Sequence, residues 1–579
     1  MRQLLVLKPG PRRWPLALRA GLCMALPVAI GWAVGDIGSG LLATIGAFTA
    51  LYGANRPYLF RAGFLAGVAV CFSVFVAFGD WAAQVPWAGV LAICLVAVLS
   101  TFVCNALAVG PPGAYMFVLA CAAGTGLATE HLAPWRVGLL VLAGGALAWL
   151  VHMAGAAFGF RRPERESVAA AARATQAYVD AVGTGAVETT RHRAAQALHE
   201  SWKMLVNFQP PHRVSGPALT ALRAEALRLH VLFAETMNGV ADGAAPPVPD
   251  RADPDRIPLG RPGTVDLLRR AATRESTASR IALRVGVAAL ITGFVALWLG
   301  VDHSYWAVAA AVLMLHQGFD WIRTVARGAE RMLGTFVGLA VAGVVLALEP
   351  HGLVLALILG VLQFVVEILV TRNYALSVVF ITPLALTIAY SGSPVHDVPS
   401  LLVARGIDTV IGCVIALLVY FIAVRRHNVA RLDGTIAATL RAVNATAPYV
   451  AGRRIGSDGA RAARRDLQLC LMAMVAAYDT GVGGSERERR SAERMWPTVV
   501  AAEDLGYRVL ATCWTIEHGD AGRDGAGLAP EGLDAFTAAV DTLAEAVMTT
   551  TAPGAHDEIS GFGSAEIDRL RKSLVCKAD

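Results

Sequence analysis

The stretch AGVLAICLVAVLSTFVCNALAV, residues 88–109, contains no Asp, Glu, Lys, Arg or His. As a helix rising about 1.5 Å per residue it would be about 33 Å long, enough to cross the roughly 30 Å hydrocarbon core of a bilayer. Similar uncharged stretches occupy residues 21–35, 63–78 and 137–151. The sequence therefore predicts an integral membrane protein.

The composition agrees with this prediction. Of 579 residues, 55 % are apolar and only 16 % are charged, and the mean hydropathy is +0.53, which does not fit a set of soluble domains. No small-residue cleavage site ends the first apolar stretch and others follow it closely, so we expect it to stay in the protein. The net charge of +6 comes mostly from arginine. Because no basic tract is interleaved with aromatic residues, we expect no nucleic-acid partner.

The chain repeats itself with a period of about 265 residues. LRAG at 18–21 returns as LRVG at 283–286, and RAGFLAG at 61–67 resembles RMLGTFVG at 331–338. Each set has six predicted spans: 16–35, 40–54, 62–79, 87–108, 114–128 and 136–158, then 281–300, 304–318, 332–348, 351–370, 374–390 and 400–424. An even number of spans places both sets in the same sense, as parallel repeats related by an axis along the membrane normal.

Orientation follows from the loop arginines, because cytoplasmic loops carry the excess of basic residues. Arginines precede the first span, lie between the second and third and follow the sixth, whereas the alternate loops carry Asp36, Asp80 and Glu130. The second set shows the same bias. Both termini are therefore expected in the cytoplasm.

Two segments differ from the spans, being charged, alanine-rich and patterned at helical period. The predicted domains are a first membrane repeat (1–159), a helical cytoplasmic domain (160–279), a second membrane repeat (280–424) and a second helical cytoplasmic domain (425–579). We expect each cytoplasmic segment to be a small bundle, with a linker at 243–262 and loop after Thr550. The predicted fold class is all-α, a membrane protein of two parallel six-span repeats.

The sequence lacks the motifs of the common catalytic sites. We find no phosphate-binding loop, dinucleotide fingerprint, His-Glu-x-x-His or nucleophile elbow, so we predict neither an enzyme nor an ATP-driven pump. The nine cysteines show neither paired nor metal-ligand spacing, and we interpret them as packing residues. No metal and no cofactor are predicted.

Ionisable side chains within spans are costly and therefore candidates for function. Arg405 and Asp408, three residues apart, share one face of the last span. Either they form a neutralising pair, or Arg405 meets a substrate carboxylate while Asp408 takes up a proton. Arg136 occupies the equivalent place in the sixth span, and with Arg405 it would form a clamp for a carboxylate at the pseudo-axis.

Other polar residues in the spans have a structural and a functional interpretation. Arg19 and Arg284 form a second pair near the cytoplasmic ends, where the long side chain would reach lipid headgroups. Glu367 is a second proton-coupling candidate, although a structural ion pair with Arg372 is the favoured interpretation. His152 and His316 are single histidines near membrane boundaries.

Short or interrupted spans at corresponding positions are a sign of a substrate site in transporters. The second and eighth spans are only about fifteen residues long, Pro111-Pro112-Gly113 precedes the fifth, and Pro383 lies in the eleventh. The binding region is predicted there, unless these helices are short only because they pack inside the bundle. The candidate polar contacts are Thr44, Tyr115, Tyr374 and Thr382.

The motifs of the second half carry a family resemblance. LRVG at 283–286, RMLGTFVG at 331–338, NYALSVVFITPLALT at 373–387 and RGIDTVIGCVIA at 405–416 resemble the fusaric acid resistance and aromatic acid exporter family, related distantly to plant aluminium-activated malate transporters. The resemblance implies a bacterial inner-membrane exporter of aromatic carboxylic or similar organic anions, driven by the proton gradient. The first half departs from the motifs, with Phe64 in place of Thr335 and Ala114 in place of Asn373.

Three functions remain open at this point: a secondary exporter, a gated anion channel, and a membrane scaffold whose helical domains dock envelope or regulatory partners. The expected partners are the lipid bilayer, a small organic anion, and a second copy of the chain or an envelope adaptor protein. The substrate, the coupling ion and the oligomeric state are not carried by any residue pattern.

Overall fold

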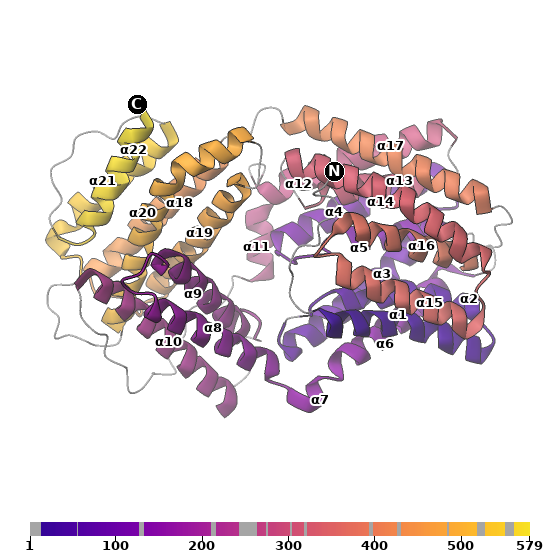
Figure 1. Ribbon diagram of the computed structural model, residues 1–579, viewed down its shortest axis with the longest axis horizontal. Coiled ribbons are helices and arrows are strands. Elements are labelled where there is room, and N and C mark those ends of the chain that lie inside the picture. The colour runs from indigo at the N-terminus through magenta and orange to yellow at the C-terminus, as the bar shows by residue number, and fades with distance from the viewer. Residues whose placement is uncertain are drawn as a thin grey trace. The chain divides into compact units, whose positions relative to one another are not determined.

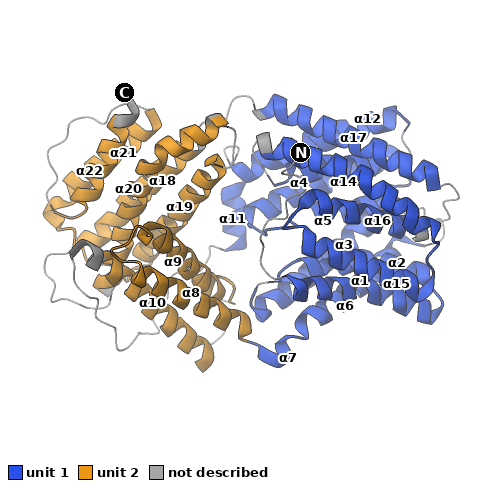
Figure 2. Ribbon diagram, in the orientation of Figure 1, with its two compact units in different colours: residues 1–160, 262–426 blue, residues 161–261, 427–579 orange. Residues whose placement is uncertain are grey.

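The computed structural model is helical wherever it is described (Figure 1). It describes residues 13–54, 56–126, 132–209, 216–242, 263–273, 276–300, 304–317, 321–392, 398–424, 430–482, 486–517, 527–549 and 561–578. The predicted linker at 243–262 lies outside these ranges. The chain divides into two compact units: unit 1 is residues 1–160 with 262–426, and unit 2 is residues 161–261 with 427–579 (Figure 2).

Unit 1 contains a helix at each of the twelve predicted spans. The first set is α1 (Trp14–Val34), α2 (Ile37–Ala47, continued by a 3₁₀ turn), α3 (Tyr58–Ala82), α4 (Pro86–Ala106), α5 (Tyr115–Gly126) and α6 (Pro134–Met153), followed by α7 (Ala156–Gly159). The second is α12 (Thr277–Trp298), α13 (Ser304–Leu315), α14 (Trp321–Ala347), α15 (Gly352–Leu369), α16 (Tyr374–Gly392) and α17 (Val398–Val424), preceded by α11 (Thr264–Ala271).

Eight of these helices are long and apolar enough to cross a membrane: α1, α3, α4, α6, α12, α14, α15 and α17. The other four, α2, α5, α13 and α16, are shorter apolar helices and hold the second and fifth place of each set. Residues 40–47 of α2 and 306–315 of α13 are all buried. These helices therefore pack inside unit 1, while the long helices expose apolar side chains.

The two sets exchange neighbours reciprocally. The first helix of each set packs against the fourth helix of the other: α1 lies along α15, and α12 lies along α4. Within each set the third helix packs on the fifth, as α3 on α5 and α14 on α16. The second helix packs on the sixth, as α2 on α6 and α13 on α17. The first and fourth helices of each set therefore find a packing partner in the other set.

Glycines allow the closest helix crossings. A Cβ atom on Gly144 of α6 would lie 1.8 Å from the carbonyl oxygen of Ala43 in α2, and one on Gly46 of α2 would lie 1.9 Å from that of Val141 in α6. A Cβ atom on Gly412 of α17 would lie 2.3 Å from the carbonyl oxygen of Ala307 in α13. Small residues let backbones approach in this way in membrane helices.

Five exposed tryptophans mark one face of unit 1, while a sixth, Trp14, starts α1 at the opposite end. With each helix running opposite to the one before, Trp32, Trp81, Trp87, Trp135 and Trp298 lie at helix ends on a single face, and they are 47 % to 85 % exposed. The Trp32 ring also lies against Gly352 at the start of α15. Tryptophan is enriched at membrane–water interfaces, so these residues fix the position of one interface. We call this side the tryptophan face; Arg13, Arg280 and Arg372 lie near helix ends at the opposite face.

Unit 2 joins the two segments that the sequence predicted as separate bundles. Its helices are α8 (Arg162–Asp180), α9 (Val187–Trp202), α10 (Pro217–Asp242), α18 (Ala430–Ala451), α19 (Asp458–Val482), α20 (Glu486–Glu517), α21 (Leu533–Thr549) and α22 (Ser564–Ala578). One hydrophobic core contains Tyr178 and Phe233 of the first segment with Tyr507 and Phe536 of the second. The Phe233 ring meets Tyr178 at 5.3 Å and Tyr507 at 5.7 Å between centroids. The prediction of two separate bundles was therefore wrong, because each segment buries its apolar face against the other.

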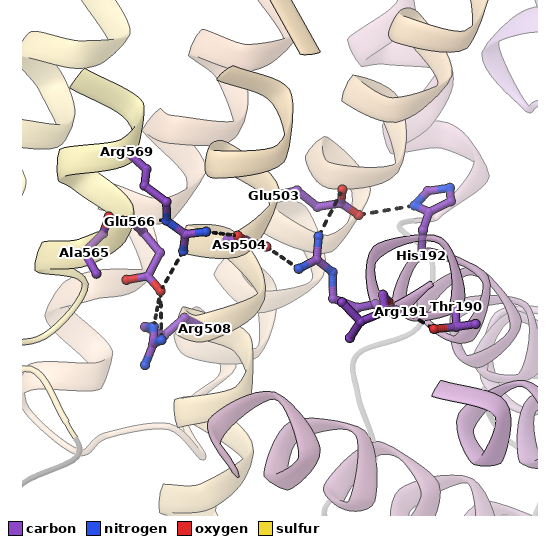
Figure 3. Close-up of polar contacts among 10 residues, drawn as sticks. Thr190, Arg191, His192, Glu503, Asp504, Arg508, Ala565, Glu566 and Arg569 are labelled. Atoms are coloured by element: carbon purple, nitrogen blue, oxygen red, sulfur yellow. Dashed lines mark hydrogen bonds and ion pairs between the residues drawn. The ribbon is translucent and has the colours of Figure 1, made fainter. Parts of the chain in front are cut away.

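A network of ion pairs also joins the two segments of unit 2 (Figure 3). Arg191 of α9 donates to Asp504 of α20, which also accepts from Arg569 of α22 at 2.8 Å. His192 lies 3.2 Å from the Glu503 carboxylate. The network continues from Arg569 to Glu566 and on to Arg508. Since the charges balance, it is a structural element of unit 2 and carries no net charge with which to bind a ligand.

Candidate functional site

Helix α17 buries an arginine and an aspartate within the apolar part of unit 1. Arg405 is 4 % exposed, Asp408 is fully buried, and no ion pair joins them. The Arg405 guanidinium lies over the Trp306 ring of α13, 4.8 Å from its centroid. Neither carboxylate oxygen of Asp408 nor Nε of Arg405 has a hydrogen-bond partner in the described part of the chain. We call Arg405, Asp408 and Trp306 the Arg405 site.

A third buried charge, Arg331 of α14, was not among the predicted site residues. It is 2 % exposed, lies close to Tyr115 and Tyr374, and is near enough to Arg405 for their charges to repel. One turn earlier, the Arg327 guanidinium lies 3.6 Å from the centroid of the Tyr374 ring. The predicted span began at residue 332, whereas α14 begins at Trp321, so Arg331 is ten residues inside a helix.

Of the predicted contacts, the structure brings two together. Tyr115 opens α5, Tyr374 opens α16, and both belong to one buried cluster with Leu313 of α13. The two threonines bond within their own helices: the Thr44 hydroxyl donates to the Leu41 carbonyl at 2.6 Å, and that of Thr382 donates to the Val378 carbonyl at 3.0 Å. The hydroxyl hydrogens of Thr44 and Thr382 are therefore bonded to backbone carbonyls of their own helices.

The structure places the equivalent arginines Arg136 and Arg405 in different surroundings. Arg136 is exposed and lies over the ring of Trp135, itself on the tryptophan face, at 5.2 Å. Arg136 follows the start of α6 by two residues, whereas Arg405 is seven residues into α17. Helix position therefore separates them, and Arg136 does not share the buried surroundings of Arg405.

The second predicted arginine pair also differs between the halves. Arg19 is part-exposed, and its Nε donates to the Pro15 carbonyl at 3.1 Å. Arg284 lies over the Tyr420 ring at 4.9 Å and donates to the Leu315 carbonyl at 3.4 Å. Arg284 is thus held by protein groups in addition to any contact with lipid headgroups.

Glu367 pairs across the two sets of helices. Its carboxylate lies 3.9 Å from Arg13, the residue before α1, and Gln363 donates to it at 3.5 Å. The predicted pair with Arg372 is absent from the ion pairs of the described residues. His152 is fully buried, and neither of its ring nitrogens has a hydrogen-bond partner in the ranges described.

The buried charges suit an anion. Arg405 lies near the Asp408 carboxyl and over the Trp306 ring, whereas Arg331 lies close to Tyr115 and Tyr374 and no acidic group among the described residues acts on it. Guanidinium groups remain charged and bind carboxylates in a planar, bidentate manner. No group of three or more possible metal ligands occurs among the described residues.

Comparison with known proteins covers this region. Residues 289–419, from α12 to α17, match the family described as fusaric acid resistance protein-like, so the resemblance predicted from the motifs is confirmed for this segment. The chain is also similar to the uncharacterised membrane protein YvaC of Bacillus subtilis (strain 168), at 26 % identity over 555 residues, covering 87 % of this chain and 86 % of YvaC. No solved structure matches the chain.

Proposed function

We propose, from the premise that residues 289–419 belong to the fusaric acid resistance protein-like family, that this membrane protein exports small organic anions, with aromatic carboxylates as the favoured class. The observation that supports this most is the burial of Arg331 and Arg405 beside aromatic rings, with Asp408 as the one acidic group that acts on Arg405 and none that acts on Arg331 among the described residues. Uncompensated positive charge inside a membrane is costly, and a bound carboxylate would remove that cost.

The proposal includes a bacterial inner-membrane location with both termini in the cytoplasm. The arginine bias of the loops supports this orientation and makes the tryptophan face the outer one. The two sets of six helices are parallel repeats about an axis along the membrane normal, and the reciprocal packing of α1 on α15 and of α12 on α4 supports this arrangement.

Proton coupling is assigned to Asp408. Its carboxyl is buried without a hydrogen-bond donor in the part described, and ionising such a group is costly. The charge on Asp408 would therefore depend on what Arg405 binds, which couples proton uptake to substrate binding. Glu367 already has Arg13 and Gln363 as partners, so it is the weaker candidate for this role.

The test is transport of radiolabelled benzoate by the full chain reconstituted in liposomes, with and without an imposed proton gradient. Benzoate accumulates against its gradient in the wild type, and the accumulation ends when the proton gradient is dissipated. Arg405→Gln raises the benzoate KM by about 10- to 100-fold, since it removes a hydrogen bond between charged groups. Asp408→Asn retains downhill flux and loses accumulation.

The same assay distinguishes the alternatives. A gated channel carries benzoate only downhill, whatever the proton gradient. A membrane scaffold carries none, and Arg405→Gln then behaves as the wild type while deletions in unit 2 are disruptive. Either result would reject the exporter.

A further inference from the structure

The ends of α5 and α16 that lie away from the tryptophan face come together over α13. Their first residues, Tyr115 and Tyr374, pack in one buried cluster with Ala309 and Leu313 of α13 and Val378 of α16. The C-terminal end of α13 adds His316, whose ring lies 6.1 Å from that of Tyr115. Three elements from both sets of helices thus meet at this point.

Polar atoms in this cluster lack partners. Nε of Arg331 and Nε2 of His316 are buried without a hydrogen-bond partner in the described ranges, and the Tyr374 hydroxyl, which lies close to Arg331, has no acceptor for its hydrogen there. Arg331 is 2 % exposed, His316 3 % and Tyr374 9 %. Buried polar groups are nearly always satisfied in native proteins, and leaving one unpaired is costly. Nδ1 of His316 lies 3.1 Å from the Leu313 carbonyl and therefore carries the hydrogen, so its Nε2 is an acceptor. Nε of Arg331 and the Tyr374 hydroxyl are donors, and together they indicate a ligand that supplies the missing acceptor.

The N-terminus of α5 adds a further attraction for an anion. Helix N-termini carry partial positive charge and free N–H groups. Asn373 caps α16 by accepting from the Leu376 amide at 3.0 Å, whereas Ala114, in the same place before α5, has no side chain that can do so. The loop before α5 is fixed by the Tyr52 hydroxyl, which donates to the Gly113 carbonyl at 2.6 Å. The uncapped end is therefore held in place.

This cluster is separate from the Arg405 site along the helices. Arg331 lies ten residues from the start of α14, or about 15 Å from the face opposite the tryptophans. Arg405 lies seven residues from the start of α17, or about 10 Å from the tryptophan face. No acidic side chain is paired with Arg331 among the described residues. An anion moving between the faces would meet first one arginine and then the other.

We infer that Arg331, Tyr374 and the N-terminus of α5 form a second binding subsite for a carboxylate, placed before the Arg405 site on the transport path. This inference rests on the proposed function. The Arg331 guanidinium and the Tyr374 hydroxyl donate to the carboxylate, and the α5 amides face its negative charge. The two subsites hold the anion in turn, and Tyr115 lies between them, close to both arginines.

Calorimetric titration of the detergent-purified full chain with sodium benzoate tests the subsite. The wild type binds two benzoates per chain. Arg331→Gln weakens one of them by about 10- to 100-fold and leaves the other unchanged, while Arg405→Gln has the converse effect. Tyr374→Phe removes only one hydroxyl and weakens the same benzoate as Arg331→Gln, which keeps the test valid if Arg331→Gln does not fold.

The matched control is Arg323→Gln, an exposed arginine two turns earlier on α14, which leaves both affinities unchanged. The subsite is rejected if Arg331→Gln and Tyr374→Phe bind two benzoates with wild-type affinity. Displacement of benzoate from the Arg331 subsite by equimolar inorganic phosphate would overturn its assignment to a carboxylate. Loss of transport with both benzoates still bound would instead reject the proposed export.

Discussion

Replacing Arg191 by methionine tests whether the ion network holds the two segments of unit 2 together. Arg191 comes from α9 of the first segment, and its partners Asp504 and Glu503 come from α20 of the second. The side chains of Arg191, Glu503 and Asp504 are 10 %, 4 % and 10 % exposed. Methionine retains an unbranched apolar chain, so the substitution removes the charge and leaves most of the packing.

The expected cost follows from that burial. Removing one partner of a buried ion pair costs about 3–5 kcal/mol, because the remaining charge stays buried. Here two consecutive carboxylates remain, with Arg569 and His192 as their other partners, which favours the lower end of the range. The matched control is Arg162→Met. Its pair with Glu166 is 76 % and 64 % exposed, and breaking such a surface pair costs about 0–1 kcal/mol.

Hydrogen exchange followed by mass spectrometry measures the effect locally in the full chain. In Arg191→Met, exchange of α9 and α20 peptides rises by about two to four orders of magnitude, while peptides of α1 and α15 are unchanged. Adding Asp504→Asn recovers part of the loss, since Arg569 retains Glu566. Equal exchange in Arg191→Met and Arg162→Met would show that the network does not hold the segments together.

Two other perturbations address unit 2 and the helix crossings of unit 1. Burial lowers the pKa of His230 to about 4, and that of His199 likewise to about 4, so between pH 6.5 and 4 the unfolded chain binds protons that the folded chain does not. Unit 2 therefore loses stability as the pH falls through this window. In urea titrations, His230→Gln reduces the loss of unfolding free energy between pH 7 and pH 5 by about 2 kcal/mol. An unchanged pH dependence in His230→Gln would contradict this explanation. At the α2–α6 crossing, Gly144→Ala forces a Cβ atom against the Ala43 carbonyl and lowers stability by about 1–3 kcal/mol. The control Gly67→Ala places its Cβ atom in open space and is neutral. Equal melting temperatures of the two variants would refute the close crossing of α2 and α6.

The membrane helices could be predicted from the sequence because the signal is local. An uncharged run of about twenty residues has few alternatives to a span, and residues 88–109 lie almost entirely on α4. The prediction of a helix start failed at α14, where charged residues lie within the membrane helix. Arg323, Arg327 and Glu330 made the start of α14 appear to be a loop, so the predicted span began one residue after Arg331.

The environment of an arginine could not be predicted from repeat alignment alone. Arg136 and Arg405 align, but α6 begins only two residues before Arg136, whereas α17 begins seven residues before Arg405. A difference of five residues is about 7.5 Å along a helix, which separates the interface from the apolar interior. Helix boundaries are the least reliable part of a sequence prediction, and here they decide which arginine is buried.

The organisation of unit 2 depends on contacts between distant segments. Both segments show amphipathic periodicity, which does not say what covers the apolar face. The loop predicted after Thr550 also includes α22, where Ile567, Leu570 and Leu574 are buried at helical spacing. The exposed charged residues Asp568, Arg569 and Lys572 lie between these positions and concealed the short pattern.

The reciprocal packing of unit 1 constrains how transport could work. Because α1 lies along α15 and α12 along α4, neither set of helices can move without the other at these contacts. The short helices α5 and α16 are different: each packs on the third helix of its own set, and they bring Tyr115 and Tyr374 to the same cluster. Movement of α5 and α16 would change the surroundings of Arg331 while leaving α1 against α15. In the proposed export, a route for an anion would therefore open by movement of the short inner helices and not by separation of the two sets.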